Sequence, residues 1–256
     1  TAYGTAEAVR CVYMSAGILD GFTLSNGATF DAAQSSSPYD SGGGGVCMAG
    51  AAPGAEVRNC VVRNCRAYSG GAAYQGALKS CTLDQNWASL HGGATYESLL
   101  EDCLVNGNLA ASNGGGAYYG SLSHCKLTGN VSESGGGTYY GTANNCLYIG
   151  NSAATGGAVY FGTLNNCTIT GNKAESGGGT YNGTYYNCIV WGNTTLTGTV
   201  NNNTFGTFRY SCMQPLRTGI GNIAADPLFV GNGDLSLRAG SPCLNKGNNA
   251  YVTESH

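Results

Sequence analysis

The chain has 256 residues, a formal net charge of −3 and only 10% charged residues, and it is rich in glycine (43) and cysteine (12). Hydrophobic residues make up 42% of it, which argues against intrinsic disorder. Its lysines and arginines are scattered, and no apolar run reaches membrane-spanning length. We therefore expect no nucleic-acid partner and no insertion of this chain into a membrane.

The N-terminal part is predicted to be an irregular start of a repeat. Residues 17–29 fit one copy, and residues 30–42 interrupt the pattern and are interpreted as an inserted loop. Regular copies follow, and seven cysteines at intervals of 21 or 22 residues set their register: Cys60, Cys81, Cys103, Cys125, Cys146, Cys167 and Cys188. A fixed period of this length is typical of a solenoid protein.

Three further positions keep the phase of the cysteines. A tyrosine stands seven residues before the cysteine in six copies, and an apolar or aromatic residue stands two residues after it. An asparagine stands five residues after the cysteine: Asn86, Asn108, Asn130, Asn151, Asn172 and Asn193. Glycine pairs or triplets close each copy and disfavour helices, whereas short apolar runs bounded by Asn and Gly predict strands and tight corners.

These features predict an all-β fold, a right-handed single-stranded parallel β-helix of about nine coils. We expect it to span residues 1–212, with the inserted loop near residues 30–42, and residues 213–256 to form an irregular segment that packs on it or caps it. Successive coils lie about 4.8 Å apart, so equivalent side chains stack. The cysteines should then stack in the core, and the asparagines should form a hydrogen-bonded ladder at a corner.

The cysteine stack is predicted to hold free thiols. Side chains stacked in register lie about 4.8 Å apart, whereas the Cβ atoms of a disulfide lie about 3.8 Å apart. A single file of sulfurs also lacks the tetrahedral geometry that zinc prefers, so we expect no metal site, and no motif indicates a cofactor. Cys11, Cys47, Cys212 and Cys243 lie outside the stack, and whether they pair is left open.

Glu133 and Glu175 are weak candidates for catalytic residues. They occupy the same position two coils apart, about 9.6 Å along the axis, which lies within the broad range for an inverting glycosidase. Arg58, Lys79 and Glu101 share another position in consecutive copies. Because such charged columns are often solvated surface ladders, we expect no catalysis, and a polysaccharide lyase or glycoside hydrolase is the alternative.

Tyr119, Tyr140 and Phe161 are the candidate binding residues. Each directly follows a tyrosine of the repeat, and because neighbours in a strand point to opposite faces, we expect one set of rings inside and the other outside. An exposed file of rings beside Asn and Gly is a platform for sugar rings or for a partner protein. The alternative is that these rings only cover the corner of the coil.

The repeats resemble those of bacterial secreted right-handed β-helix proteins of the pectate-lyase-like superfamily. The segment ADPLFVGNGDLSLRAGSPCLNKGNN, residues 225–249, is similar to the terminal region of bacterial choice-of-anchor Q surface proteins, through Asp226–Val230 and Gly240–Cys243. These resemblances imply the β-helix fold and an extracellular or cell-surface location. They imply no single activity, because this fold carries lyases, hydrolases, adhesins and inert shafts.

The sequence therefore predicts a non-catalytic extracellular or cell-surface module that acts as a shaft, an adhesin or a glycan-binding surface. The expected partner is a polysaccharide or another surface protein. A further alternative is a filament subunit whose rods stack end to end through uncapped coils, since open strand edges pair readily.

Overall fold

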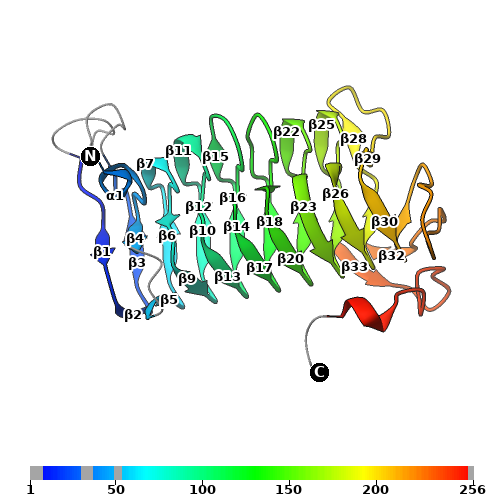
Figure 1. The fold of residues 1–256 in the computed structure, drawn as a ribbon, viewed down its shortest axis with the longest axis horizontal. Helices are drawn as coiled ribbons and strands as arrows, with labels where there is room; N and C mark the ends of the chain where they lie inside the picture. The colour runs from blue at the N-terminus through cyan, green and yellow to red at the C-terminus, as the bar shows by residue number, and fades with distance from the viewer. Residues whose placement is uncertain (1–7, 30–36, 49–53, 253–256) are drawn as a thin grey trace.

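The structure, a computed structural model, describes residues 8–29, 37–48 and 54–252. In this part of the chain nearly every element is a short strand, and the strands wind into a solenoid whose coils stack along one long axis (Figure 1). All strand pairs within the solenoid are parallel. The predicted parallel β-solenoid is therefore confirmed.

The largest sheet holds 16 strands in two columns that merge in the long strands β23 and β26. The first column consists of β1 (Val12–Met14), β4 (Val46–Met48), β8 (Ala73–Tyr74), β12 (Thr95–Tyr96), β16 (Ala117–Tyr118), β19 (Thr138–Tyr139), β23 (Val159–Asn165), β26 (Thr180–Tyr186) and β29 (Asn203–Thr204). The second column adds β2 (Gly17–Asp20), β5 (Ala55–Arg58), β9 (Ala77–Lys79), β13 (Leu99–Glu101), β17 (Ser121–Ser123), β20 (Thr142–Asn144) and β30 (Thr207–Arg209).

Three smaller parallel sheets complete the coils. The nine-stranded sheet consists of β3 (Thr23–Ser25), β6 (Val61–Arg63), β10 (Thr82–Asp84), β14 (Leu104–Asn106), β18 (Lys126–Thr128), β21 (Leu147–Ile149), β24 (Thr168–Thr170), β27 (Ile189–Trp191) and β31 (Cys212–Met213). The two three-stranded sheets are β7 (Arg66–Ser69), β11 (Trp87–His91) and β15 (Leu109–Ala110), and β22 (Ser152–Thr155), β25 (Lys173–Ser176) and β28 (Thr194–Thr195).

The register between coils follows the sequence period. In the nine-stranded sheet Thr82 pairs with Leu104, and Leu104 pairs with Lys126. Seven strands lie between the end strands β3 and β31, and they mark about seven regular turns. The regular solenoid is thus slightly shorter than the nine coils predicted, because the insertion after β3 and the C-terminal segment after β31 replace the repeat at its two ends.

The core is one cluster of buried side chains enclosed by the sheets. A typical coil contributes Leu100 from one side and Val105 from another, both buried. Where Tyr148 replaces the aliphatic residue, Ala143 replaces the leucine, and the Tyr148 hydroxyl lies 3.5 Å from Oγ1 of Thr138. The two exchanges together conserve core volume and give the buried hydroxyl a partner, as close packing requires.

A ladder of buried asparagine side chains runs along one corner. Asn151 donates from Nδ2 to Oδ1 of Asn172 at 2.9 Å and to the Leu127 carbonyl at 3.0 Å, and its Oδ1 accepts from the backbone N–H and Nδ2 of Asn130. The same side-chain bond joins all six asparagines of the repeat: Asn86, Asn108, Asn130, Asn151, Asn172 and Asn193. Asn202 extends the ladder after a step of only nine residues, which the sequence period does not indicate.

The seven cysteines of the repeat form a stack of buried free thiols. The Cys125 N–H donates to Sγ of Cys146 at 3.3 Å, and Sγ of Cys125 donates to the Ser123 carbonyl at 3.2 Å. Ser211 takes the next position, where its Oγ accepts from the Cys188 N–H at 3.0 Å. The position therefore needs a small side chain that can both accept and donate a hydrogen bond.

The C-terminal segment contacts the last coil and turns back along the side of the rod (Figure 1). The Met213 N–H donates to the Ile223 carbonyl at 3.0 Å, and Tyr251 stacks on Tyr186 with ring centroids 4.1 Å apart. The segment contains the antiparallel pair β32 (Phe229–Gly231) and β33 (Asp234–Leu237) and the short helix η3 (Asn249–Tyr251). One of the two ends that end-to-end stacking would use is therefore occupied by the chain itself.

The insertion predicted near residues 30–42 is described only from residue 37 on. There α1 (Pro38–Ser41) forms a single helical turn beside β7, and Oγ of Ser37 accepts from the Tyr39 N–H at its start. Residues 30–36 lie outside the described residues. Within the described part, no helix has the length and apolar character needed to span a bilayer.

Candidate binding groove

The predicted aromatic residues lie at a corner between the two columns of the largest sheet. Tyr119, Tyr140 and Phe161 have φ of +49°, +48° and +51°, the left-handed region. This region costs a residue other than glycine about 1–2 kcal/mol. Backbone hydrogen bonds of 2.9 Å hold the corner, from the Tyr119 N–H to the Tyr139 carbonyl and from the Tyr140 N–H to the Tyr160 carbonyl.

Both sets of aromatic rings lie on the outer side of the coil, so the expectation that one set points inward is wrong. The inward side chain is the one before the repeat tyrosine, and Ala117 and Thr138 are buried examples. Tyr118 is half-buried, and its ring centroid lies 4.7 Å from that of Tyr119. The alternation of faces fails because Tyr119 is not in the extended conformation that the rule assumes.

The rings form two parallel stacks. In the first, centroids are 4.9 to 5.3 Å apart between neighbours, through Tyr74, Tyr96, Tyr118, Tyr139, Tyr160 and Tyr181. In the second, Tyr140 lies 5.3 Å from Tyr119 and 5.1 Å from Phe161, with interplanar angles of 10° and 5°. Both faces of Tyr140 are therefore covered, and a ligand beside this stack would meet ring edges and phenol hydroxyls rather than ring faces.

A shallow groove of about 370 Å³ runs beside the second stack. We call it the aromatic groove, and its lining comprises Tyr119, Gly120, Ser121, Tyr140, Gly141, Thr142, Phe161, Gly162, Thr163, Gly183 and Thr184. A Cβ atom on Gly141 would lie 2.9 Å from the Gly120 carbonyl oxygen, and one on Gly183 would lie 2.5 Å from that of Gly162. Only glycine fits where coils approach so closely, and the floor of the groove therefore stays free of side chains.

The wall opposite the rings is a column of hydroxyls. Thr142 pairs in register with Thr163, and Thr163 with Thr184, while Ser121 begins the column. Oγ1 of Thr142 donates to Oγ of Ser121 at 3.0 Å, and Ser121, Thr142 and Thr163 are exposed. None of the described residues that line the aromatic groove is charged.

A second groove of about 480 Å³ adjoins the first on its N-terminal side, and both include Ser121. Its lining is aliphatic and charged, and includes Leu99, which is 60% exposed. Within its lining, Lys79 forms an ion pair at 2.8 Å with Glu101, its register partner in the next coil. At its margin, the hydrogen bond from Arg58 lowers the pKa of Glu56. The continuous depression thus changes from charged to neutral along the rod.

The candidate catalytic pair lies on another side of the coil. The parallel bridges from Ser134 to Thr155 and from Thr155 to Ser176 place Glu133 and Glu175 in one column, two coils apart. Both side chains are exposed, and neither lines either groove. Among the described residues, no basic side chain forms an ion pair with them.

The histidines of the solenoid are also separate from one another. His91 stacks on Tyr118 with centroids 4.4 Å apart, whereas Nε2 of His124 lies 3.2 Å from Nδ2 of Asn145. Within the described ranges, no three His, Cys, Asp or Glu side chains are grouped so that they could hold a metal ion.

The chemistry of the aromatic groove is that of neutral hydrogen-bonding groups. Burial raises the pKa of Tyr118, Tyr139 and Tyr160, the repeat tyrosines of the coils that form the groove, so their phenols stay protonated at neutral pH. The lining of the groove offers hydroxyl groups, backbone atoms and the edges of aromatic rings. The described residues of this lining contain no acid–base pair for proton transfer. This arrangement suits binding of an uncharged, hydroxyl-rich chain.

The sequence contains a signal for this groove that the aromatic pattern alone does not reveal. Each corner aromatic is followed by glycine and a hydroxyl residue, in YGS at 119–121, YGT at 140–142 and FGT at 161–163. The ring, the bare floor and the hydroxyl wall are therefore consecutive residues of one coil, repeated by the period.

Comparisons with family models, curated proteins and solved structures found no match. The fold and the groove therefore define the class of this protein: a parallel β-solenoid with a neutral surface groove along its axis.

Proposed function

We propose that this chain is a non-catalytic binding module in which the solenoid is a rigid shaft and the aromatic groove holds a neutral glycan. The observation that carries the proposal is the uncharged groove between the stacked ring edges of Tyr119, Tyr140 and Phe161 and the hydroxyl column. Sugar rings combine apolar C–H surfaces with hydroxyl groups, and such sites use apolar walls with a few placed polar groups.

The geometry along the axis suits a polymer rather than a single small molecule. The same ring–glycine–hydroxyl unit recurs in three consecutive coils and ends at Gly183 and Thr184. Each coil therefore offers a similar set of contacts about 4.8 Å further on. Several weak contacts in series give useful affinity, because the linked units of one polymer bind together.

The resemblance of the repeats to pectate-lyase-like proteins and of residues 225–249 to choice-of-anchor Q proteins supports a secreted or cell-surface setting, bacterial in origin, in which such a glycan is met. Right-handed coiling is part of the same proposal. The absence of charged groups from the aromatic groove favours binding over the alternative of a lyase, whose substrate carboxylate needs neutralising groups.

A glycan array run beside a reducing-sugar release assay tests the proposal. We expect retention of neutral polysaccharides without product release, and loss of retention when Tyr119, Tyr140 and Phe161 are all replaced by alanine. Product release that disappears in Glu133→Gln or Glu175→Gln would contradict the proposal and favour an enzyme.

A further inference from the structure

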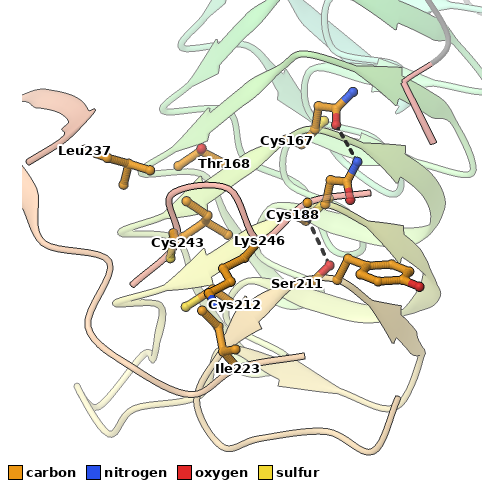
Figure 2. A pocket seen from close by; sticks show the side chains of 14 residues that line it. Cys167, Thr168, Cys188, Ser211, Cys212, Ile223, Leu237, Cys243 and Lys246 are labelled. Carbon is orange, nitrogen blue, oxygen red and sulfur yellow. Dashed lines mark hydrogen bonds between the residues drawn. The ribbon is translucent and has the colours of Figure 1, made fainter. Parts of the chain in front are cut away.

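Two pairs of cysteines outside the stack of thiols face each other near the two ends of the solenoid. At the C-terminal end, Cys212 belongs to β31 and Cys243 to the segment between β33 and η3. Both line a cavity of about 260 Å³, in which Figure 2 shows their side chains beside each other and beside Lys246. Sγ of Cys212 donates to the Ala225 carbonyl at 3.1 Å.

The N-terminal pair has the same layout. Cys11 directly precedes β1, and Cys65 directly precedes β7, so the two residues come from different coils. Sγ of Cys11 lies 3.6 Å from the Ser25 carbonyl oxygen, and Sγ of Cys65 lies 3.3 Å from the Arg63 carbonyl oxygen. Ser25 and Arg63 pair in register in neighbouring strands, so the two thiols approach the same point of the sheet. Cys65 stands at the position that asparagine takes in later copies, where its N–H donates to Oδ1 of Asn86.

These two pairs differ from the cysteine stack in access. In each pair one thiol reaches solvent, since Cys11 is exposed and Cys243 is half-exposed, while Cys65 and Cys212 are buried. Every thiol of the stack is buried. Oxidation of a cysteine requires access to its sulfur, so burial protects the stack, whereas the end pairs each have one accessible thiol.

The pairs also differ from the stack in geometry. Stacked cysteines occupy the same position in neighbouring coils, where parallel register keeps their Cβ atoms about 4.8 Å apart. A disulfide needs about 3.8 Å between Cβ atoms. The end pairs are free of this restraint, because Cys243 lies outside the parallel sheets and Cys11 pairs in register with neither strand next to Cys65.

We propose that the solenoid carries an oxidisable dithiol clasp at each end, Cys11–Cys65 and Cys212–Cys243, which forms a disulfide by exchange with a low-molecular-weight disulfide. This inference goes beyond glycan binding and does not depend on it. The neighbouring Cys65 side chain lowers the pKa of Cys11, which favours the thiolate of this accessible sulfur, whereas burial raises the pKa of Cys212.

The exchange balances in two steps. The thiolate of Cys11 or Cys243 attacks one sulfur of glutathione disulfide, forms a mixed disulfide and releases one glutathione thiolate. The buried partner, Cys65 or Cys212, then loses its proton to solvent and attacks the protein sulfur of the mixed disulfide, which releases a second glutathione. The protein thiols lose two electrons and two protons, and the glutathione disulfide is reduced to two thiols.

The C-terminal clasp would fix the returning segment to the body of the rod. Without it, the segment is held by contacts such as the Asn187–Asn248 hydrogen bonds and the Tyr186–Tyr251 stack. Segments held by few contacts open locally and are cut by proteases, and a covalent link opposes that opening. Oxidation should therefore slow the proteolytic release of residues after β31.

The test incubates the reduced full chain with glutathione disulfide, blocks remaining thiols by alkylation and maps linked peptides by mass spectrometry without reduction. We expect four of the twelve thiols to be lost, with links only between Cys11 and Cys65 and between Cys212 and Cys243. Cys65→Ser and Cys212→Ser should trap glutathione on Cys11 and Cys243, whereas Cys103→Ser, the control from the stack, should leave both links unchanged.

The unsubstituted protein decides the outcome even if a serine variant fails to fold. Glutathione that stays attached to Cys11 and Cys243 in the unsubstituted chain would show that the partner thiols cannot reach them. Thiols that remain free, or links that involve the stack, would equally overturn the proposal.

Discussion

Replacing Asn151 by leucine should destabilise the solenoid strongly, because this side chain is buried and takes part in four hydrogen bonds. Leucine has a similar size but no polar group. The backbone N–H of Asn130 then loses its acceptor inside the core, at a cost of about 1–3 kcal/mol. The other three bonds contribute about 0.5–1.5 kcal/mol each, so the whole loss is about 2.5–7.5 kcal/mol.

Equilibrium unfolding in urea, followed by circular dichroism, measures this loss. Lys173→Ala is the matched control, since Lys173 is an exposed residue of the neighbouring coil and such substitutions change stability by about 0.5 kcal/mol or less. Asn172→Leu should behave like Asn151→Leu, because Asn172 occupies the next position of the ladder. Equal midpoints for the leucine variants and Lys173→Ala would refute the argument that the ladder supports the fold.

Three further outcomes are expected. Gly141→Ala should lower the melting temperature and reduce the free energy of unfolding by about 1–3 kcal/mol, because the new Cβ would lie 2.9 Å from the Gly120 carbonyl oxygen. Gly240→Ala is the control and should leave the melting temperature unchanged, because Gly240 has open space around it. The stability that Tyr74 contributes should be constant below pH 10 and fall as the pH rises from about 10 to 12, because burial raises its folded-state pKa to about 12. Melting temperatures measured across this pH range check the direction of the change, and the Tyr74→Phe variant should lack this decline. Thiol counting in denaturant without reductant should find at least the seven stacked cysteines free, and a smaller number would contradict the stack.

The period, the strand class and the two internal columns could be predicted from the sequence because each coil repeats one pattern. A cysteine or asparagine that recurs every 21 or 22 residues stacks on itself whatever the details of the corner. The extension of the asparagine ladder to Asn202 could not be predicted, because the short step from Asn193 breaks the period. Ser211 takes the next position of the cysteine stack, and the cysteine pattern does not predict this because the residue is a serine.

The candidate site was predictable in its residues but not in its geometry. Tyr119, Tyr140 and Phe161 stand out in the sequence, yet their left-handed conformation depends on bonds to the next coil, such as that from the Tyr119 N–H to the Tyr139 carbonyl. That conformation turns both sets of rings outward. Stacking then covers the ring faces, so the expected platform becomes a wall of ring edges.

The most direct test of the central claim is affinity electrophoresis in gels that contain a neutral polysaccharide, such as starch, galactomannan, xylan or mixed-linkage glucan. The unsubstituted chain should be retarded by at least one of them. Tyr140→Ala should restore free migration, while Tyr13→Ala, which removes an exposed ring of β1 outside the groove, should not. Free migration of the unsubstituted chain in every gel, or equal retardation of Tyr140→Ala, would contradict a glycan-binding aromatic groove.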